Sequence, residues 1–187
     1  MIGLAVLAVG LLVNYVLTFA LIRRLNSLIE QRSPDNLFLK PGQQAPDFSA
    51  QTLDGAAVTR SSYAGRPVTF VFFKSGCEPC REAIPSYEQA RPLAERVGVE
   101  LVLVSVEDAE RTRAFVREQQ ISLPVLVAPA SENTFQHDYQ LPGTPAFCSL
   151  NERGLVQASG FASIDAEAWR TQVASWNTTT SRIPSPA

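Results

Sequence analysis

The pattern of hydrophobic and polar positions separates an apolar N-terminal segment from a longer region of alternating patterns. Residues 1–22 contain no charged side chain, and only Asn14 and Thr18 are clearly polar. A helix rises about 1.5 Å per residue, so a helix of this length spans the ~30 Å hydrocarbon core of a bilayer. Arg23 and Arg24 follow directly and can extend their charges to the lipid headgroups. The pattern predicts a single transmembrane anchor over residues 1–22.

Two other structures compete with an anchor for this apolar run. A cleaved signal peptide has basic residues before its apolar core and a small-x-small cleavage site after it. No Lys or Arg precedes the run, and residues 19–22 (FALI) offer no such site. A buried core helix is the second alternative, and an uncharged run of this length at a chain terminus argues against it.

The segments on either side of the alternating region are more polar. Leu25, Leu28 and Ile29 keep a helical spacing, so the anchor helix is expected to continue past the membrane. Pro34 ends it, because a proline disfavours the helical conformation of the residue before it. The expected divisions are a transmembrane anchor over 1–22, a juxtamembrane helix and linker over 23–40, a folded domain over 41–176 and a disordered tail over 177–187.

Within the folded domain, strand patterns and helix patterns alternate. Residues 67–74 (PVTFVFFK) are nearly continuous in β-branched and aromatic side chains, as in a strand buried on both faces. Pro85 and Pro92 predict a bend or an interruption in a helix. Residues 53–55 (LDG) predict a hairpin turn. The expected strands are 47–52, 56–60, 67–74, 100–106, 124–127 (short, at an edge), 145–150 and 155–160, and the expected helices are 79–96, 108–119 and 165–176. This order predicts an α/β fold with a mixed central sheet between helices.

Length and charge narrow the function classes. The chain has 187 residues, enough for one domain that buries a core without disulfide staples. It carries 16 Lys plus Arg against 18 Asp plus Glu, for a net charge of −2. A nucleic-acid-binding protein would show a basic excess or a basic stripe. We therefore expect no nucleic-acid partner.

The candidate chemistry lies at Cys77-Glu78-Pro79-Cys80, where a buried strand is followed by a helix. A cysteine at a helix N-terminus faces free backbone N–H groups and the positive end of the helix dipole, which favour the nucleophilic thiolate. Pro79 fits the first helical turn, where its missing N–H does no harm. We expect Cys77 to be the exposed, attacking thiol and Cys80 the shielded, resolving thiol. A zinc site is the alternative, but zinc needs four ligands and the chain has no second CxxC.

A second signal is Gly143-Thr144-Pro145, directly before an expected strand. A proline at this position is a natural place for a cis peptide bond, which would leave the Thr144 backbone free to pair with an extended substrate. A simple turn proline is the alternative. The two signals together make Thr144 and Pro145 candidates for substrate binding.

These motifs resemble the thioredoxin superfamily, and more narrowly the membrane-anchored TlpA/ResA-type thiol–disulfide oxidoreductases with their MauD-like branch. The resemblance covers roughly residues 40–176 and is carried by 42–48 (GQQAPDF), 72–81 (FFKSGCEPCR) with Pro85, and 143–146 (GTPA). It implies a thioredoxin-like fold with an N-terminal β-hairpin extension, a cis Pro145, and a redox-active Cys77–Cys80 disulfide that needs no other cofactor. Implied partners are protein thiols or disulfides and a redox partner protein.

Two positions depart from the family pattern. The family places Trp before the first cysteine, where this chain has Gly76, and Glu three residues after the second, where it has Ala83. Glu82 is adjacent to that position, but one residue rotates a helical side chain by about 100°. Glu82 and Glu107 are candidate proton acceptors for Cys80, and a solvated surface charge is the alternative for each.

Other residue types near these motifs have simpler interpretations. Cys148 follows Pro145 on an apolar strand and is expected to be a buried, inert thiol. His137 stands alone and is expected at the surface. Glu78 disfavours a thiolate at Cys77, and Arg81 acts in the opposite direction.

The expected function is the exchange of a CxxC disulfide with protein partners, in the reduction or maturation of extracytoplasmic proteins. A peroxiredoxin-like peroxidase is one alternative, but such enzymes carry Thr three residues before the nucleophile, where this chain has Lys74. A copper or assembly chaperone is another, but Sco-like proteins space their cysteines three apart and add a His.

Two features of the sequence predict opposite sides of the membrane for the domain. Arg23, Arg24, Arg32 and Lys40 all follow the apolar run, so the positive-inside rule places the domain in the cytoplasm. Disulfide chemistry favours an oxidising compartment. We give the chemistry the greater weight and expect an extracytoplasmic domain.

Overall fold

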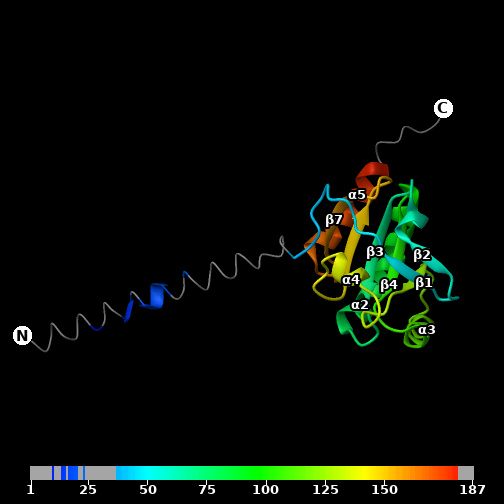
Figure 1. Cartoon of the computed structure of the whole chain (residues 1–187). Helices are drawn as coiled ribbons and strands as arrows, with labels where there is room; N and C mark the ends of the chain where they lie inside the picture. The colour runs from blue at the N-terminus through cyan, green and yellow to red at the C-terminus, as the bar shows by residue number, and fades with distance from the viewer. Residues whose placement is uncertain (1–9, 11–13, 16, 21–22, 24–36, 181–187) are drawn as a thin grey trace, which may run out of the picture. The chain divides into compact units, whose positions relative to one another are not determined.

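The computed structural model describes residues 10, 14–15, 17–20, 23 and 37–180 (Figure 1). The chain divides into two compact units, residues 1–37 and 38–187. Most of the predicted anchor and linker therefore lies outside the described residues. Among those that are described, no helix is long and apolar enough to cross a membrane.

The folded unit contains one mixed sheet with helices on both faces. Its strand order is β2-β1-β5-β4-β3-β6-β7. The strands are Ser49–Thr52 (β1), Ala57–Thr59 (β2), Val68–Phe73 (β3), Glu100–Ser105 (β4), Val125–Val127 (β5), Ala146–Leu150 (β6) and Val156–Phe161 (β7). The helices are Arg60–Tyr63 (η2, a 3-10 helix), Glu78–Arg96 (α2), Ala109–Glu118 (α3), Phe135–Asp138 (α4) and Glu167–Thr180 (α5). The predicted α/β fold with a mixed central sheet is confirmed. Its first two strands, β1 and β2, form an antiparallel hairpin.

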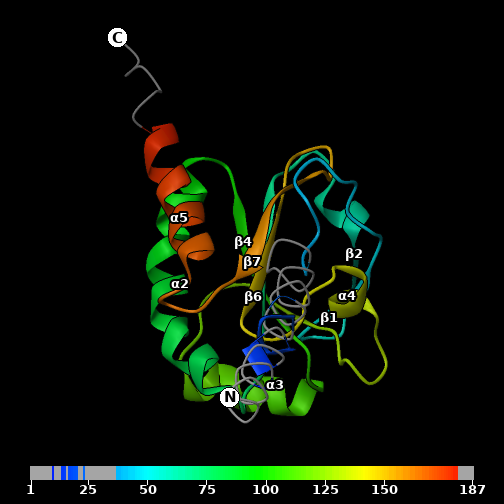
Figure 2. The ribbon, with the colours of Figure 1, turned by 90° about the vertical axis from the view of Figure 1, so that its left-hand side faces the viewer.

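The order of the strands decides which face each helix covers. β3, β4 and β5 are neighbours and parallel, so the chain crosses the sheet in one direction through α2 and α3. Right-handed crossovers place both of these helices on the same face. The chain then returns past β3 to β6, and α4 lies on the opposite face. Figure 2 shows α2 and α5 side by side on one face of the sheet and α4 on the other.

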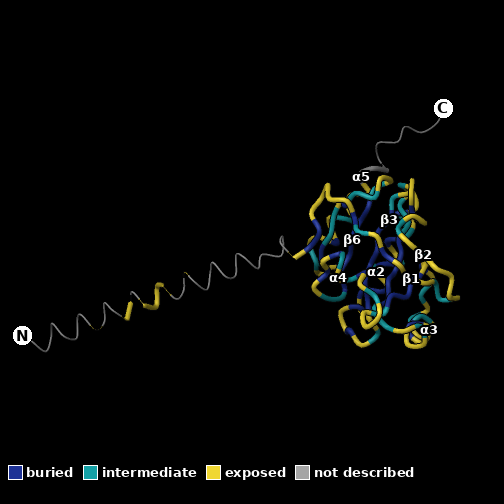
Figure 3. Tube along the Cα trace, in the orientation of Figure 1, coloured by how far each residue is buried: buried dark blue, intermediate teal, exposed yellow. Residues whose placement is uncertain are grey.

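Each face has its own apolar core, and many of the buried tube segments in Figure 3 belong to the central strands between them, β3, β4, β5 and β6. On the α2 face, Trp169 and Trp176 of α5 are 3% exposed and pack edge to face, with ring centroids 6.0 Å apart. On the α4 face, the rings of Phe48 and Phe135 stack with centroids 3.8 Å apart. A side chain therefore belongs to one core or the other according to the parity of its strand position.

The prediction that residues 124–127 form an edge strand is wrong. β5 lies inside the sheet, because the hairpin extends the sheet beyond it: β1 pairs antiparallel with β5 through Gln51 and Val127. A strand of three residues, buried throughout, needs a covering neighbour on each side. The order of strands in the sheet is a long-range property that the local pattern does not contain.

Pro85 and Pro92 were predicted to bend or interrupt the helix, and an interruption is wrong, because α2 continues as one element through both. Both prolines are on the exposed side, and the opposite side of the helix is buried against the sheet. Most helical stability in proteins comes from such packing rather than from local propensity.

The boundaries of the domain differ from the predicted 41–176. Phe38 and Leu39 are 7% and 5% exposed and belong to the core, and the Ser159 hydroxyl donates to the Leu39 carbonyl at 2.6 Å. At the other end, α5 continues through Thr180, so the first residues of the predicted tail are helical, while 181–187 lie outside the described residues. Asn and Thr cost a helix only about 0.5 kcal/mol each, and the next proline is Pro184.

The aromatic stack on the α4 face supports a stability prediction. Phe135 is 1% exposed and contacts the rings of Phe48 and Phe72. Replacing it with Ala should lower the free energy of unfolding by about 3–5 kcal/mol, because the change leaves a cavity in the core. Urea denaturation of the purified chain, followed by circular dichroism, measures the loss. His137→Ala is the control, since that side chain is 90% exposed on the same short helix, and equal losses for the two variants would contradict the assignment of this core.

Candidate active site

The register of the sheet brings three chain segments to one edge. β3 and β4 are parallel and end level with each other, with Phe73 paired to Ser105. β6 is antiparallel to β3 and begins opposite its end, with Ala146 paired to Phe72. The segments after β3, after β4 and before β6 therefore meet at the carboxyl ends of the parallel strands, where α/β sheets hold their ligands.

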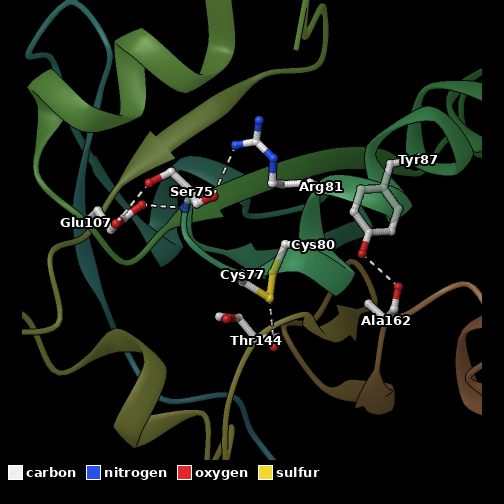
Figure 4. The surroundings of a disulfide bond; sticks show 8 residues. All are labelled: Ser75, Cys77, Cys80, Arg81, Tyr87, Glu107, Thr144 and Ala162. Carbon is white, nitrogen blue, oxygen red and sulfur yellow. Dashed lines mark hydrogen bonds between the residues drawn. A yellow bond between two sulfur atoms is a disulfide. The ribbon is translucent and has the colours of Figure 1, made fainter. Parts of the chain in front are cut away.

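The two cysteines form a disulfide at the start of α2 (Figure 4). Cys77 is the N-cap residue of the helix, and its Cα lies 5.2 Å from that of Cys80. The backbone N–H groups of Cys80 and Arg81 donate to the Cys77 carbonyl at 3.0 and 3.1 Å, which closes the first turn. Cys77 is 8% exposed and Cys80 is 0% exposed. Cys77 is therefore the less buried cysteine of the pair.

The segment before β6 lies against the disulfide. The Cys77 Sγ is 3.3 Å from the Thr144 carbonyl oxygen, a distance at which a reduced thiol could donate to it (Figure 4). The Thr144–Pro145 peptide bond is cis, as the motif predicted. Thr144 is half-buried and Pro145 is buried. The structure thus brings Thr144 and Pro145 to the cysteine pair, although they lie far apart in the sequence.

Glu107 holds the loop before Cys77. The Ser75 backbone N–H donates to its Oε2 at 2.5 Å, and the Ser75 hydroxyl donates to its Oε1 at 3.1 Å (Figure 4). Its side chain is only 16% exposed, so the alternative of a solvated surface charge is wrong for Glu107. Glu82, by contrast, is exposed on α2, and the neighbouring Ala83 is fully buried.

The Ser75–Glu107 pair was missed by the sequence analysis, although the sequence contains a signal for it. Phe73 and Ser105 are paired on neighbouring parallel strands, and Ser75 and Glu107 each follow two residues later. Positions at equal offsets beyond paired strand residues lie side by side. The pairing of the two strands was needed to make this inference.

The Arg81 side chain contacts Ser75 and two residues of α3. Its guanidinium donates to the Ser75 carbonyl at 3.4 Å, forms an ion pair with Glu118 of α3, and lies over the Phe115 ring at 5.4 Å. The Glu118 carboxylate therefore compensates part of the positive charge that was expected to favour a Cys77 thiolate. Glu78 and Pro79, between the cysteines, are exposed.

The remaining candidates are remote from this chemistry. Cys148 is 0% exposed in the middle of β6, and burial raises the pKa of its thiol to about 12. The interpretation of Cys148 as a buried thiol agrees with this position. The His137 side chain is 90% exposed and contacts the neighbouring Asp138 carboxylate at 3.2 Å. Among the described residues, no three His, Cys, Asp or Glu side chains come together in a group that could hold a metal ion.

Comparison with known proteins agrees with this geometry. The sequence profile of the AhpC/TSA family matches residues 41–160. The thioredoxin-like protein YneN of Bacillus subtilis is 31% identical over 134 residues, which are 70% of this chain and 77% of that protein. The methylamine utilization protein MauD of Methylobacillus flagellatus is 27% identical over 154 residues, which are 79% of this chain and 72% of that protein.

A thiol-disulfide oxidoreductase ResA from Bacillus thuringiensis is 24% identical over 92 residues. These residues are 49% of this chain and 53% of that protein, so the match spans about half of each. Among solved structures, the thioredoxin domain of a thiol-disulfide oxidoreductase from Bacteroides vulgatus superposes with a TM-score of 0.63 at 18% identity, covering 74% of this chain and 98% of that one. This likeness confirms the thioredoxin-like fold.

The difference in exposure between the two cysteines predicts a difference in reactivity. After reduction, a maleimide should label Cys77 first and Cys80 much more slowly, because the Cys80 sulfur is reached only when the first turn of α2 opens. Cys148 should react only after denaturation. Mass spectrometry of digests taken at timed intervals measures the order, with Cys148→Ser as the control for stoichiometry. Equal labelling of Cys77 and Cys80 would contradict the assignment.

Proposed function

We propose that this chain, which belongs to the AhpC/TSA family and is a thioredoxin-like thiol–disulfide oxidoreductase, exchanges its Cys77–Cys80 disulfide with protein partners while anchored in a membrane. The observation that supports it most strongly is the pair of cysteines at the start of α2, one 8% exposed and one 0% exposed, with a backbone carbonyl beside the first sulfur. Family membership and the site chemistry point to the same reaction.

The exchange proceeds in two steps when the chain acts as the reductant. The Cys77 thiolate attacks one sulfur of a partner disulfide, forms a mixed disulfide, and displaces the other partner sulfur as a thiolate that takes up a proton. The Cys80 thiol then loses its proton and attacks the Cys77 sulfur. This step forms the Cys77–Cys80 disulfide and releases the second partner sulfur, which also takes up a proton. The partner gains two electrons and the chain loses two, and the reverse sequence oxidises a partner.

The surroundings of the pair support these separate roles. Cys77 lies at the N-terminus of α2, where the positive end of the helix dipole favours negative charge on its sulfur. Glu107 and Ser75 hold the preceding loop, and therefore the sulfur, in place. Thr144 and Pro145 lie where an extended partner segment would run beside the reacting sulfur, so the Thr144 backbone is assigned to pairing with that segment.

The membrane anchor and the extracytoplasmic location rest on the sequence. The uncharged run over 1–22 has the length of a transmembrane helix, and disulfide exchange suits an oxidising compartment. The proposed task is the reduction or maturation of extracytoplasmic proteins. A thiol peroxidase and a copper or assembly chaperone are the competing functions, and purified protein that consumes peroxide or copurifies with copper would favour them over thiol exchange.

Trapping tests the exchange reaction directly. Cys80→Ser removes the resolving sulfur, so mixed disulfides between Cys77 and its natural partners should accumulate in cells. Non-reducing electrophoresis followed by mass spectrometry identifies them. Cys148→Ser is the matched control, because it removes a thiol that is buried away from the site, and it should trap nothing. An absence of Cys77-dependent adducts in the Cys80→Ser variant would argue against exchange with proteins.

Protease accessibility tests the membrane side. We expect protease added to intact spheroplasts to digest the domain before lysis, while a cytoplasmic marker survives. Deletion of residues 1–22 should move the protein from the membrane fraction to the soluble fraction, and deletion of residues 181–187 should not. Survival of the domain until lysis would place it in the cytoplasm, in agreement with the charge pattern after the apolar run.

A further inference from the structure

Tyr87 extends from α2 to the loop that follows β7. Its side chain is 0% exposed, and its hydroxyl donates to the Ala162 carbonyl at 2.7 Å (Figure 4). The Trp169 ring packs against it edge to face, with centroids 5.2 Å apart. Burial raises the pKa of the Tyr87 phenol, so the group stays protonated and remains a donor. The phenol thus fixes a backbone carbonyl that has no access to water.

Ala162 connects Tyr87 to the active site through two hydrogen bonds. While its carbonyl accepts from Tyr87, its N–H donates to the Pro145 carbonyl at 3.0 Å. The residue before Pro145 is Thr144, whose carbonyl oxygen lies 3.3 Å from the Cys77 Sγ. Because Cys77 and Tyr87 both belong to α2, these contacts form a closed ring: helix, disulfide, Thr144–Pro145 segment, Ala162, and back to the helix.

We propose that Tyr87 is a positioning residue, which sets the place of the Thr144–Pro145 segment relative to Cys77 and thereby the binding of protein substrates. The inference rests on the proposed pairing of a substrate segment with Thr144. Without the hydroxyl, the buried Ala162 carbonyl loses its donor, and the loop that holds Pro145 is free to shift. A small disulfide needs access to the Cys77 sulfur but makes no strand pairing, so its reduction does not depend on the contacts that connect Tyr87, Ala162 and Pro145.

The test compares two disulfide substrates on the full-length protein. Tyr87→Phe keeps the ring packing and removes only the hydroxyl. With insulin as the protein disulfide and an excess of a small dithiol to return the Cys77–Cys80 disulfide to the reduced form in each cycle, KM should rise about fivefold, the factor that corresponds to one hydrogen bond of ~1 kcal/mol, and kcat should stay within about twofold. With oxidised glutathione, both constants should be unchanged.

Tyr139→Phe is the matched control. Tyr139 is also 0% exposed, and its hydroxyl donates to the Pro46 carbonyl at 3.1 Å, but it belongs to the core on the opposite face of the sheet. A general loss of stability would affect both variants alike, whereas a positioning role raises KM for insulin only in Tyr87→Phe. Equal KM values in the two variants, or equal changes with insulin and glutathione, would overturn the proposal.

Two further measurements separate the possible failures. Amide hydrogen exchange at Ala162 in the unmodified protein should be slow, and rapid exchange there would overturn the proposal without any variant. If Tyr87→Phe binds and reduces insulin like the parent while Cys80→Ser still traps partners, only the role of Tyr87 fails. If Cys80→Ser traps nothing, the proposed function fails first.

Discussion

The pairing register of β3 with its two neighbours is the constraint on which the site depends. Val68–Phe73 is fully buried and is hydrogen-bonded along one side to a parallel strand and along the other to an antiparallel one. A slip of one residue on either side would turn the core-facing side chains to the wrong face, so the two apolar cores fix the register. With the register fixed, Cys77, Glu107 and Pro145 have no alternative but to meet at one edge. The chemistry of the site is in this sense a product of the packing of the cores.

The helix that carries the cysteines connects this edge to the rest of the fold. α2 buries Cys80, Ala83 and Tyr87 along one side, so the face that shields the second sulfur is the same face that packs on the sheet. Two residues hold Ser75 in the loop before Cys77: Glu107, which follows β4, and Arg81, which belongs to α2 itself. The loop that carries Cys77 is therefore held in one place, and Cys77 remains the less buried cysteine of the pair.

The sequence was sufficient for the features that depend on local pattern and residue chemistry. The buried strand before Cys77 and the interior position of Cys148 were accessible from composition and spacing, and both are fully buried in the structure. The interior place of β5, the unbroken course of α2 and the packing of Phe38 depend on contacts between distant segments. The Glu107–Ser75 and Tyr87–Ala162 bonds belong to the second group, since each joins elements whose proximity exists only after the sheet has formed.

The two edge strands of the sheet, β2 and β7, affect the tendency of the protein to aggregate at high concentration. At one end, β2 is only three residues long and is followed at once by η2. At the other end, the backbone of Gly42 donates to the Val156 carbonyl at 2.8 Å, and Val156 donates to the Gln43 carbonyl at 2.9 Å, so the start of β7 is already occupied. Long open edges recruit strands from other molecules and lead to aggregation. The short β2 and the covered start of β7 therefore reduce the length of open edge through which copies of this chain could pair.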